Sequence, residues 1–169
     1  MKPDPRLEHA EPPRQAVIEA APFARRKQRG KPHHEPVADE LLDDLHLAIG
    51  QGLALIGLDE DAPPAAIVDA LATHTDTAKE PSAQEVLALA CLYGQTLARA
   101  FGWGWAHVRC TRRPGILLVS PGERYATGPR SVIELGLARG GDEIRQHFAR
   151  IGDAGALPAS QPGRYLLVR

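Results

Sequence analysis

The sequence predicts an α+β fold, in which N-terminal helices precede a small antiparallel sheet that is flanked by further helices. Apolar residues recur at spacings of three and four through residues 38–101, as on one side of a helix. Short apolar runs bounded by Pro and Gly follow from residue 103 onward, which is typical of strands. Residues 1–36 are rich in proline and basic side chains, so we expect a flexible arm ahead of a single domain at 37–169.

The predicted arm holds seven of the 15 prolines, which interrupt any helix longer than two turns. Their spacing leaves room for one short helix over residues 14–20. The run at 25–31 is basic and lacks apolar residues. It is either a solvated linker or a basic segment that contacts nucleic acid or anionic lipid.

The first predicted helix spans residues 38–56, where seven apolar residues form one stripe. Four carboxylates lie in its early turns, near the positive end of the helix dipole, and Gly57 is a typical C-terminal stop. A second helix opens at residues 63–64, since proline is tolerated in a first turn, and its apolar face fades by Thr75.

The third predicted helix begins with a capping box, in which Ser82 and Glu85 satisfy backbone donors from both sides. It ends at Gly102, and apolar residues cover most of its circumference. We therefore expect this helix to be central and mostly buried.

Strands follow the third helix. Residues 103–110 and 116–119 are predicted to pair across a Pro-Gly turn, residues 124–126 add a short third strand, and residues 165–168 pair with the sheet edge.

Two further helices are expected before the terminal strand. Pro129 opens one that ends at Gly140, and Asp142 is expected to cap the other, which is followed by a loop at 152–163.

The net charge of −1 is the sum of three blocks of different sign. Residues 1–36 carry a net charge of +3, residues 37–80 carry −9, and residues 81–169 carry +5. The domain therefore divides into an acidic helical part at 37–80 and a sheet-containing part at 81–169.

No apolar run is long enough to span a bilayer, and the N-terminus has no signal-like apolar segment. Two cysteines are too few for a disulfide scaffold, so we expect a cytoplasmic protein without membrane association.

Alternation along residues 103–110 predicts two different strand faces. The small face is expected to pack against the preceding helix and consists of Gly104, Ala106, Val108 and Cys110. The opposite face consists of Trp103, Trp105, His107 and Arg109. Trp and Arg are enriched at binding hot spots, so this row is a candidate partner-binding surface. Alternatively, another helix, such as the acidic one, covers the tryptophans.

Arginines gather around the predicted turns of the sheet. They are Arg109, Arg112, Arg113, Arg124 and Arg130. Guanidinium groups bind carboxylates and phosphates bidentately, so an acidic protein or a nucleic acid fits them. Pairing with the acidic block of the same chain is the alternative.

The carboxylates of residues 37–80 are the second candidate surface. Those in the first helix and in the loop after it are Asp39, Glu40, Asp43, Asp44, Asp59, Glu60 and Asp61. Such a surface speeds association with a basic partner and resembles a nucleic-acid backbone in charge. Its alternative role is to keep a helix face and a loop solvated.

No cofactor or metal site is predicted. Asp39, Asp43 and His46 share a helix face, but bundle metal sites need facing ligands from other helices. Cys91 and Cys110 are expected to be inert core thiols. Hydrolase, metalloprotease, phosphate-loop and dinucleotide motifs are absent, although a pair such as Ser120 with His107 stays open because triads assemble in space.

Residues 82–140 carry a recurring pattern. A buried helix contains a Gly-Gln pair at 94–95, and a Gly-x-x-Trp strand, a Pro-ended strand and a Pro-started helix follow it. This pattern resembles small bacterial α+β domains of unknown function, some of which occur beside secreted toxins as immunity proteins. The resemblance implies a fold and carries no catalytic residues.

These observations favour a non-enzymatic protein that binds and occludes a partner protein, of the immunity or inhibitor type. Its predicted contact residues are those of the tryptophan strand face with Arg112 and Arg113, and the acidic residues 39–44. A nucleic-acid-associated protein that uses the basic arm and the C-terminal arginines is one alternative. An enzyme whose site the sequence does not reveal is the other, and the oligomeric state is left open.

Overall fold

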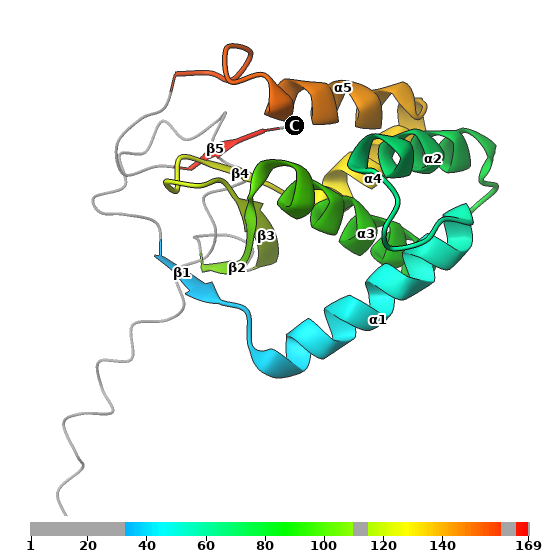
Figure 1. Cartoon of the computed structure of the whole chain (residues 1–169), viewed down its shortest axis with the longest axis horizontal. Helices are drawn as coiled ribbons and strands as arrows, with labels where there is room; N and C mark the ends of the chain where they lie inside the picture. Colours follow the sequence, from blue (N-terminus) through cyan, green and yellow to red (C-terminus); the bar gives the residue numbers. More distant parts are fainter. Residues whose placement is uncertain (1–32, 110–114, 160–164, 169) are drawn as a thin grey trace, which may run out of the picture.

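The structure is a computed structural model that describes residues 33–109, 115–159 and 165–168 (Figure 1). It confirms the α+β class: helices come first, a mostly antiparallel sheet follows, and two more helices precede the terminal strand. The predicted helix at 14–20, the basic run at 25–31 and Cys110 lie outside the described residues.

The helices agree with the predicted boundaries to within two residues. In chain order they are α1 (Asp39–Ile56), α2 (Pro64–Thr77), α3 (Ala83–Phe101), α4 (Pro129–Arg139) and α5 (Asp142–Gly152). One detail was predicted wrongly: Gly141 occupies the N-cap of α5, and Asp142 lies in the first turn, where its side chain accepts from Arg145. None of the helices in the described ranges combines the length and the hydropathy of a membrane span.

Helix α3 is central, as predicted, with α1 along one side of it and α2 and α4 along the other (Figure 1). The capping box forms: Ser82 Oγ accepts from the Glu85 amide at 3.2 Å, and Glu85 Oε2 accepts from the Ser82 amide at 2.7 Å. The bond from the Ser82 amide favours the ionised carboxylate and contributes most to lowering the pKa of Glu85, and the Ser82 side chain adds to the effect.

The strands lie in the spatial order of the sequence. They are β1 (His33–Pro36), β2 (Gly104–Arg109), β3 (Gly115–Val119), β4 (Tyr125–Thr127) and β5 (Leu166–Leu167). Neighbours are antiparallel except β4 and β5, which run parallel. The terminal strand therefore joins the sheet edge, as predicted.

Strand β1 lies in a segment that the sequence assigns to the flexible arm. It pairs with β2, placing Glu35 opposite His107. Its sequence, His-His-Glu-Pro, has no apolar alternation and ends in proline, a residue confined to edge strands. Nothing local marks it as a strand, and pairing with β2 determines its conformation.

The predicted orientation of β2 is wrong. Trp105, and not the small face, packs against α3, because Gly94 leaves room for the indole over the helix backbone. A Cβ at position 94 would lie 2.2 Å from Trp105 Cη2. Ala106 and Val108 instead join a second, smaller cluster on the other sheet face, together with Tyr165.

A buried hydrogen-bond network ties the terminal strand to the helices. His147 of α5 lies between Tyr93 of α3 and Thr127 of β4: Nδ1 is 2.6 Å from Tyr93 Oη, and Nε2 is 3.0 Å from Thr127 Oγ1. Thr127 Oγ1 donates to the Val168 carbonyl at 2.9 Å. Two helices, strand β4 and the residue that follows β5 therefore meet at one imidazole.

Candidate functional site

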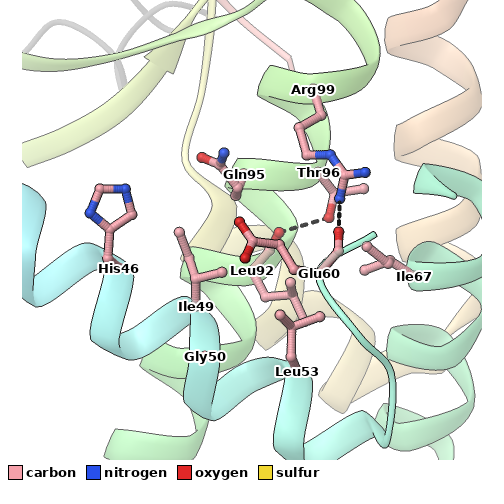
Figure 2. Close-up of a pocket in the computed structure, with 10 residues that line it drawn as sticks. All are labelled: His46, Ile49, Gly50, Leu53, Glu60, Ile67, Leu92, Gln95, Thr96 and Arg99. Carbon is pink, nitrogen blue, oxygen red and sulfur yellow. Dashed lines mark hydrogen bonds between the residues drawn. The ribbon is translucent and has the colours of Figure 1, made fainter. Parts of the chain in front are cut away.

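Helices α1, α2 and α3 enclose a cleft of about 340 Å³ (Figure 2). Its volume lies at the lower end of the range typical of small ligand pockets. The residues that line it are His46, Ile49, Gly50, Leu53, Glu60, Ile67, Leu92, Gln95, Thr96 and Arg99. Because these residues come from three helices and the α1–α2 connection, the cleft depends on tertiary packing. No local sequence motif therefore predicts it.

Two glycines of α1 set the shape of the cleft. At Gly52 the helix lies directly on α3, and a Cβ there would come within 2.6 Å of the Ala88 carbonyl oxygen. At Gly50 a Cβ would meet no atom within 4 Å. The first glycine therefore permits close packing of the two helices, and the second leaves the cleft open on the α1 side.

Arg99 holds the α1–α2 connection against α3. Its Nη1 donates to the Glu60 carbonyl at 2.5 Å and its Nη2 donates to the Ala62 carbonyl at 3.3 Å. The guanidinium thus binds backbone, and the Glu60 side chain extends separately from the connection towards Gln95 (Figure 2). Two carbonyl contacts therefore fix the position from which the Glu60 carboxylate reaches the cleft.

Apolar and polar side chains both line the cleft. Ile67 and Leu92 are almost fully buried, and the buried Thr96 hydroxyl donates to the Leu92 carbonyl at 2.8 Å. The other polar side chains that line it are those of His46, Glu60, Gln95 and Arg99. A ligand would therefore meet apolar side chains, the Glu60 carboxylate, the Gln95 amide and the Arg99 guanidinium, whereas the Thr96 hydroxyl already has its acceptor.

Exposed carboxylates flank the cleft at both ends of α1. They are Asp39, Glu40, Asp43 and Asp44 at the start of the helix and Asp59, Glu60 and Asp61 after its end. Among the described residues, none of these seven forms an ion pair. The acidic block pairs with the C-terminal block at Asp69, whose Oδ1 lies 2.9 Å from Arg145 Nε. Internal pairing thus leaves the predicted acidic surface free over the described part of the chain.

The other predicted contact residues are dispersed. Trp103 is only 6% exposed and belongs to the main core, and Trp105 is half-buried, its Nε1 donating to Gln95 Oε1 at 3.4 Å. At Gly94, Trp105 contacts α3, the helix that was expected to meet the opposite face of the strand, whereas the alternative named another helix, such as the acidic one. His107 is half-buried on β2.

The predicted arginine cluster lies mostly outside the described residues. The side chain of Arg109, as well as Arg112 and Arg113, lies outside the described residues. Arg124 is exposed, and Arg130 pairs with Glu134 one turn along α4 at 2.8 Å. That pair is exposed on both sides and therefore contributes little to stability.

The hypothetical nucleophile–base pair does not form. Ser120 is buried, and its Oγ accepts from the Tyr125 amide at 3.0 Å. His107 lies opposite Ile116, four positions from Ser120 along β3, which is roughly 13 Å in a strand. Ser120 therefore acts as a turn residue.

Metal and thiol chemistry find no support in the described residues. They contain no group of three or more His, Cys, Asp or Glu side chains arranged to hold a metal ion. Cys91 is buried in α3, and burial raises the pKa of its thiol, which disfavours the reactive thiolate.

Sequence reasoning missed the cleft, although one signal was present. Gln95 and Arg99 are polar positions in a mostly apolar helix, and both line the cleft with one turn between them. Gly50 carried no comparable signal, because its role depends on the empty space beside it. No protein-family model, curated protein or solved structure matches the chain.

Proposed function

We propose that this protein binds and occludes a positively charged partner protein through the acidic face of α1 and the loop at 59–61, as an inhibitor or immunity type of protein acting in the cytoplasm. The supporting observation is the set of seven exposed carboxylates without an ion pair among the described residues. Uncompensated charge of one sign steers a partner of the opposite sign and raises its association rate.

The distribution of this charge supports a protein partner. The carboxylates stand at both ends of an 18-residue helix, which is about 27 Å long and spans roughly the width of a standard protein–protein interface. The resemblance of residues 82–140 to domains that include immunity proteins indicates where to search: among proteins encoded beside this gene.

The test is co-purification with those neighbours, followed by kinetics on any complex. Asp39→Lys combined with Asp43→Lys should slow association about tenfold or more at low salt, with a smaller effect on dissociation. Glu134→Lys on α4, which reverses one carboxylate outside the acidic surface, is the control and should leave the association rate unchanged. No complex with any neighbour, or equal rates for the two variants, would refute the proposal.

A further inference from the structure

We propose that the cleft between α1 and α3 receives one long basic side chain, arginine or lysine, presented by the partner protein. This inference rests on the proposed function, and it names the contact that we place at the centre of the interface with the partner. The carrying observations are a cleft that combines apolar side chains with the Glu60 carboxylate, and exposed carboxylates on the part of α1 that leads to it.

The dimensions of the cleft suit a side chain better than a larger element. A volume of about 340 Å³ is too small for a helix, whose diameter with side chains is roughly 10–12 Å. Arginine and lysine combine an apolar stem with a charged end, so they bury methylene groups while the charge stays at a polar rim. Here Ile49 and Leu92 offer the apolar wall, and Glu60 offers the anionic group.

Helix geometry places negative charge beside the entrance. At 100° per residue, Asp39, Asp43, His46 and Gly50 fall within a sector of about 60° on α1. His46 and Gly50 line the cleft, so the two aspartates precede them on the same side of the helix. A cation approaching along this side passes two carboxylates before it reaches Glu60.

Arg99 also lines the cleft, and its one positive charge is outnumbered by the carboxylates of Glu60, Asp39 and Asp43. Its guanidinium donates to the carbonyls of Glu60 and Ala62, so it is directed into the α1–α2 connection. These bonds place the connection so that the Glu60 carboxylate extends towards Gln95 (Figure 2). Arg99 thus shapes the site, and the Glu60 carboxylate supplies the acceptor for the ligand, since Gln95 Oε1 already accepts from Trp105 Nε1.

The probe is N-acetyl-arginine methylamide, with the lysine analogue as a second cation and the uncharged norleucine analogue as a control. Binding is followed by NMR through the side-chain methyl groups of Ile49, Leu53 and Ile67. We expect saturable shifts at these methyls for both cations, at millimolar affinity, and affinity at least about fivefold lower for norleucine.

Gly50→Leu tests the location. A Cβ at position 50 would meet no atom within 4 Å, and a helical side chain leans towards the N-terminus, so we expect leucine there to extend over the cleft towards His46. Binding should weaken about tenfold or more, whereas Ala54→Leu, on an exposed position that borders a different depression, should have no effect. Glu60→Gln, an exposed and nearly isosteric change, should weaken the cations severalfold and leave norleucine unchanged.

The outcomes separate this inference from the proposed function. If Gly50→Leu leaves binding intact while Asp39→Lys with Asp43→Lys still slows the partner, the acidic surface stands and the cleft site is refuted. If Gly50→Leu abolishes probe binding while the double charge reversal leaves association unchanged, the cleft site stands and the acidic surface is refuted. Methyl shifts that norleucine reproduces in full would also overturn the cation site.

Discussion

Tyr93 and His147 are 54 positions apart in the sequence, yet Tyr93 Oη lies 2.6 Å from His147 Nδ1 in the core. The remaining contacts determine where the protons lie. Thr127 donates to the Val168 carbonyl, so Nε2–H of His147 must donate towards Thr127 Oγ1 and the Val168 carbonyl, 3.0 and 3.2 Å away. Nδ1 is then an acceptor, and the Tyr93 hydroxyl donates to it. The network is complete only with a neutral imidazole.

The first prediction concerns acid stability. Burial lowers the pKa of His147 to about 4, the Arg150 charge adds to this effect, and the bond to the Val168 carbonyl opposes it. The folded pKa lies below the unfolded value of 6.5, so the unfolded state binds the proton first as pH falls. Stability should drop by about 3 kcal/mol between pH 6.5 and 4, with no further loss from this group below pH 4.

Urea unfolding across this pH range measures the effect. His147→Gln should be less stable at pH 7 but should lose less stability on acidification than the parent protein. Parallel pH profiles for the two proteins would contradict the assignment of a neutral, buried imidazole.

The second prediction isolates the tyrosine hydroxyl. Tyr93→Phe leaves Nδ1 of His147 buried without a donor, so unfolding free energy should fall by about 1–3 kcal/mol. Tyr125→Phe is the matched control: its hydroxyl donates to the Pro158 carbonyl at 2.8 Å, in an exposed position that water can replace. That variant should lose only about 0.5 kcal/mol. Equal losses of stability for the two variants in thermal or urea unfolding would contradict the expected penalty for leaving His147 Nδ1 buried without a donor.

The sequence predicted those elements whose signals are local. The capping box at Ser82 and the prolines that open α2 and α4 act within one helical turn, and the predicted helix boundaries followed from them. Strand β1 and the orientation of β2 depend on contacts between distant segments. Trp105 and Gly94 are separated by a helix end and a turn, so alternation alone could not show which strand face meets α3.

The candidate site likewise has one part that local sequence signals predict and one part that depends on contacts between distant segments. The carboxylates of α1 were identified because a charge pattern is visible in the sequence. The cleft beside them was missed, because it arises where α1 approaches α3 at Gly52 and leaves space at Gly50. Whether a glycine lies in close packing or beside empty space depends on the residues that the fold brings next to it, and these are distant in the sequence.

The third prediction concerns the junction of α2 and α5. Asp76 Oδ1 accepts from the Gly141 amide at 2.7 Å, at the start of α5, where helix amides lack partners within the helix. Asp76→Ala should therefore lower stability by about 1 kcal/mol, as removal of an N-cap does. Asp69→Ala breaks a more exposed ion pair with Arg145 and should cost less, about 0.5 kcal/mol. Chemical unfolding of both variants checks the order, and a larger loss for Asp69→Ala would contradict it.

The fourth prediction compares Gly94 and Gly50, two glycines inside helices. Gly94 is closely packed, whereas Gly50 borders open space. Gly94→Ala places a methyl group 2.2 Å from the Trp105 ring and 2.8 Å from Leu118 Cδ1, so the indole must shift, at a cost of about 1–3 kcal/mol. Gly50→Ala meets no atom within 4 Å and should gain up to about 1 kcal/mol, because alanine favours the helix. Unfolding curves give both values, and tryptophan fluorescence should change for Gly94→Ala alone. Loss of stability in both variants would refute the open space beside α1, and with it the cleft on which the proposed basic-side-chain site depends.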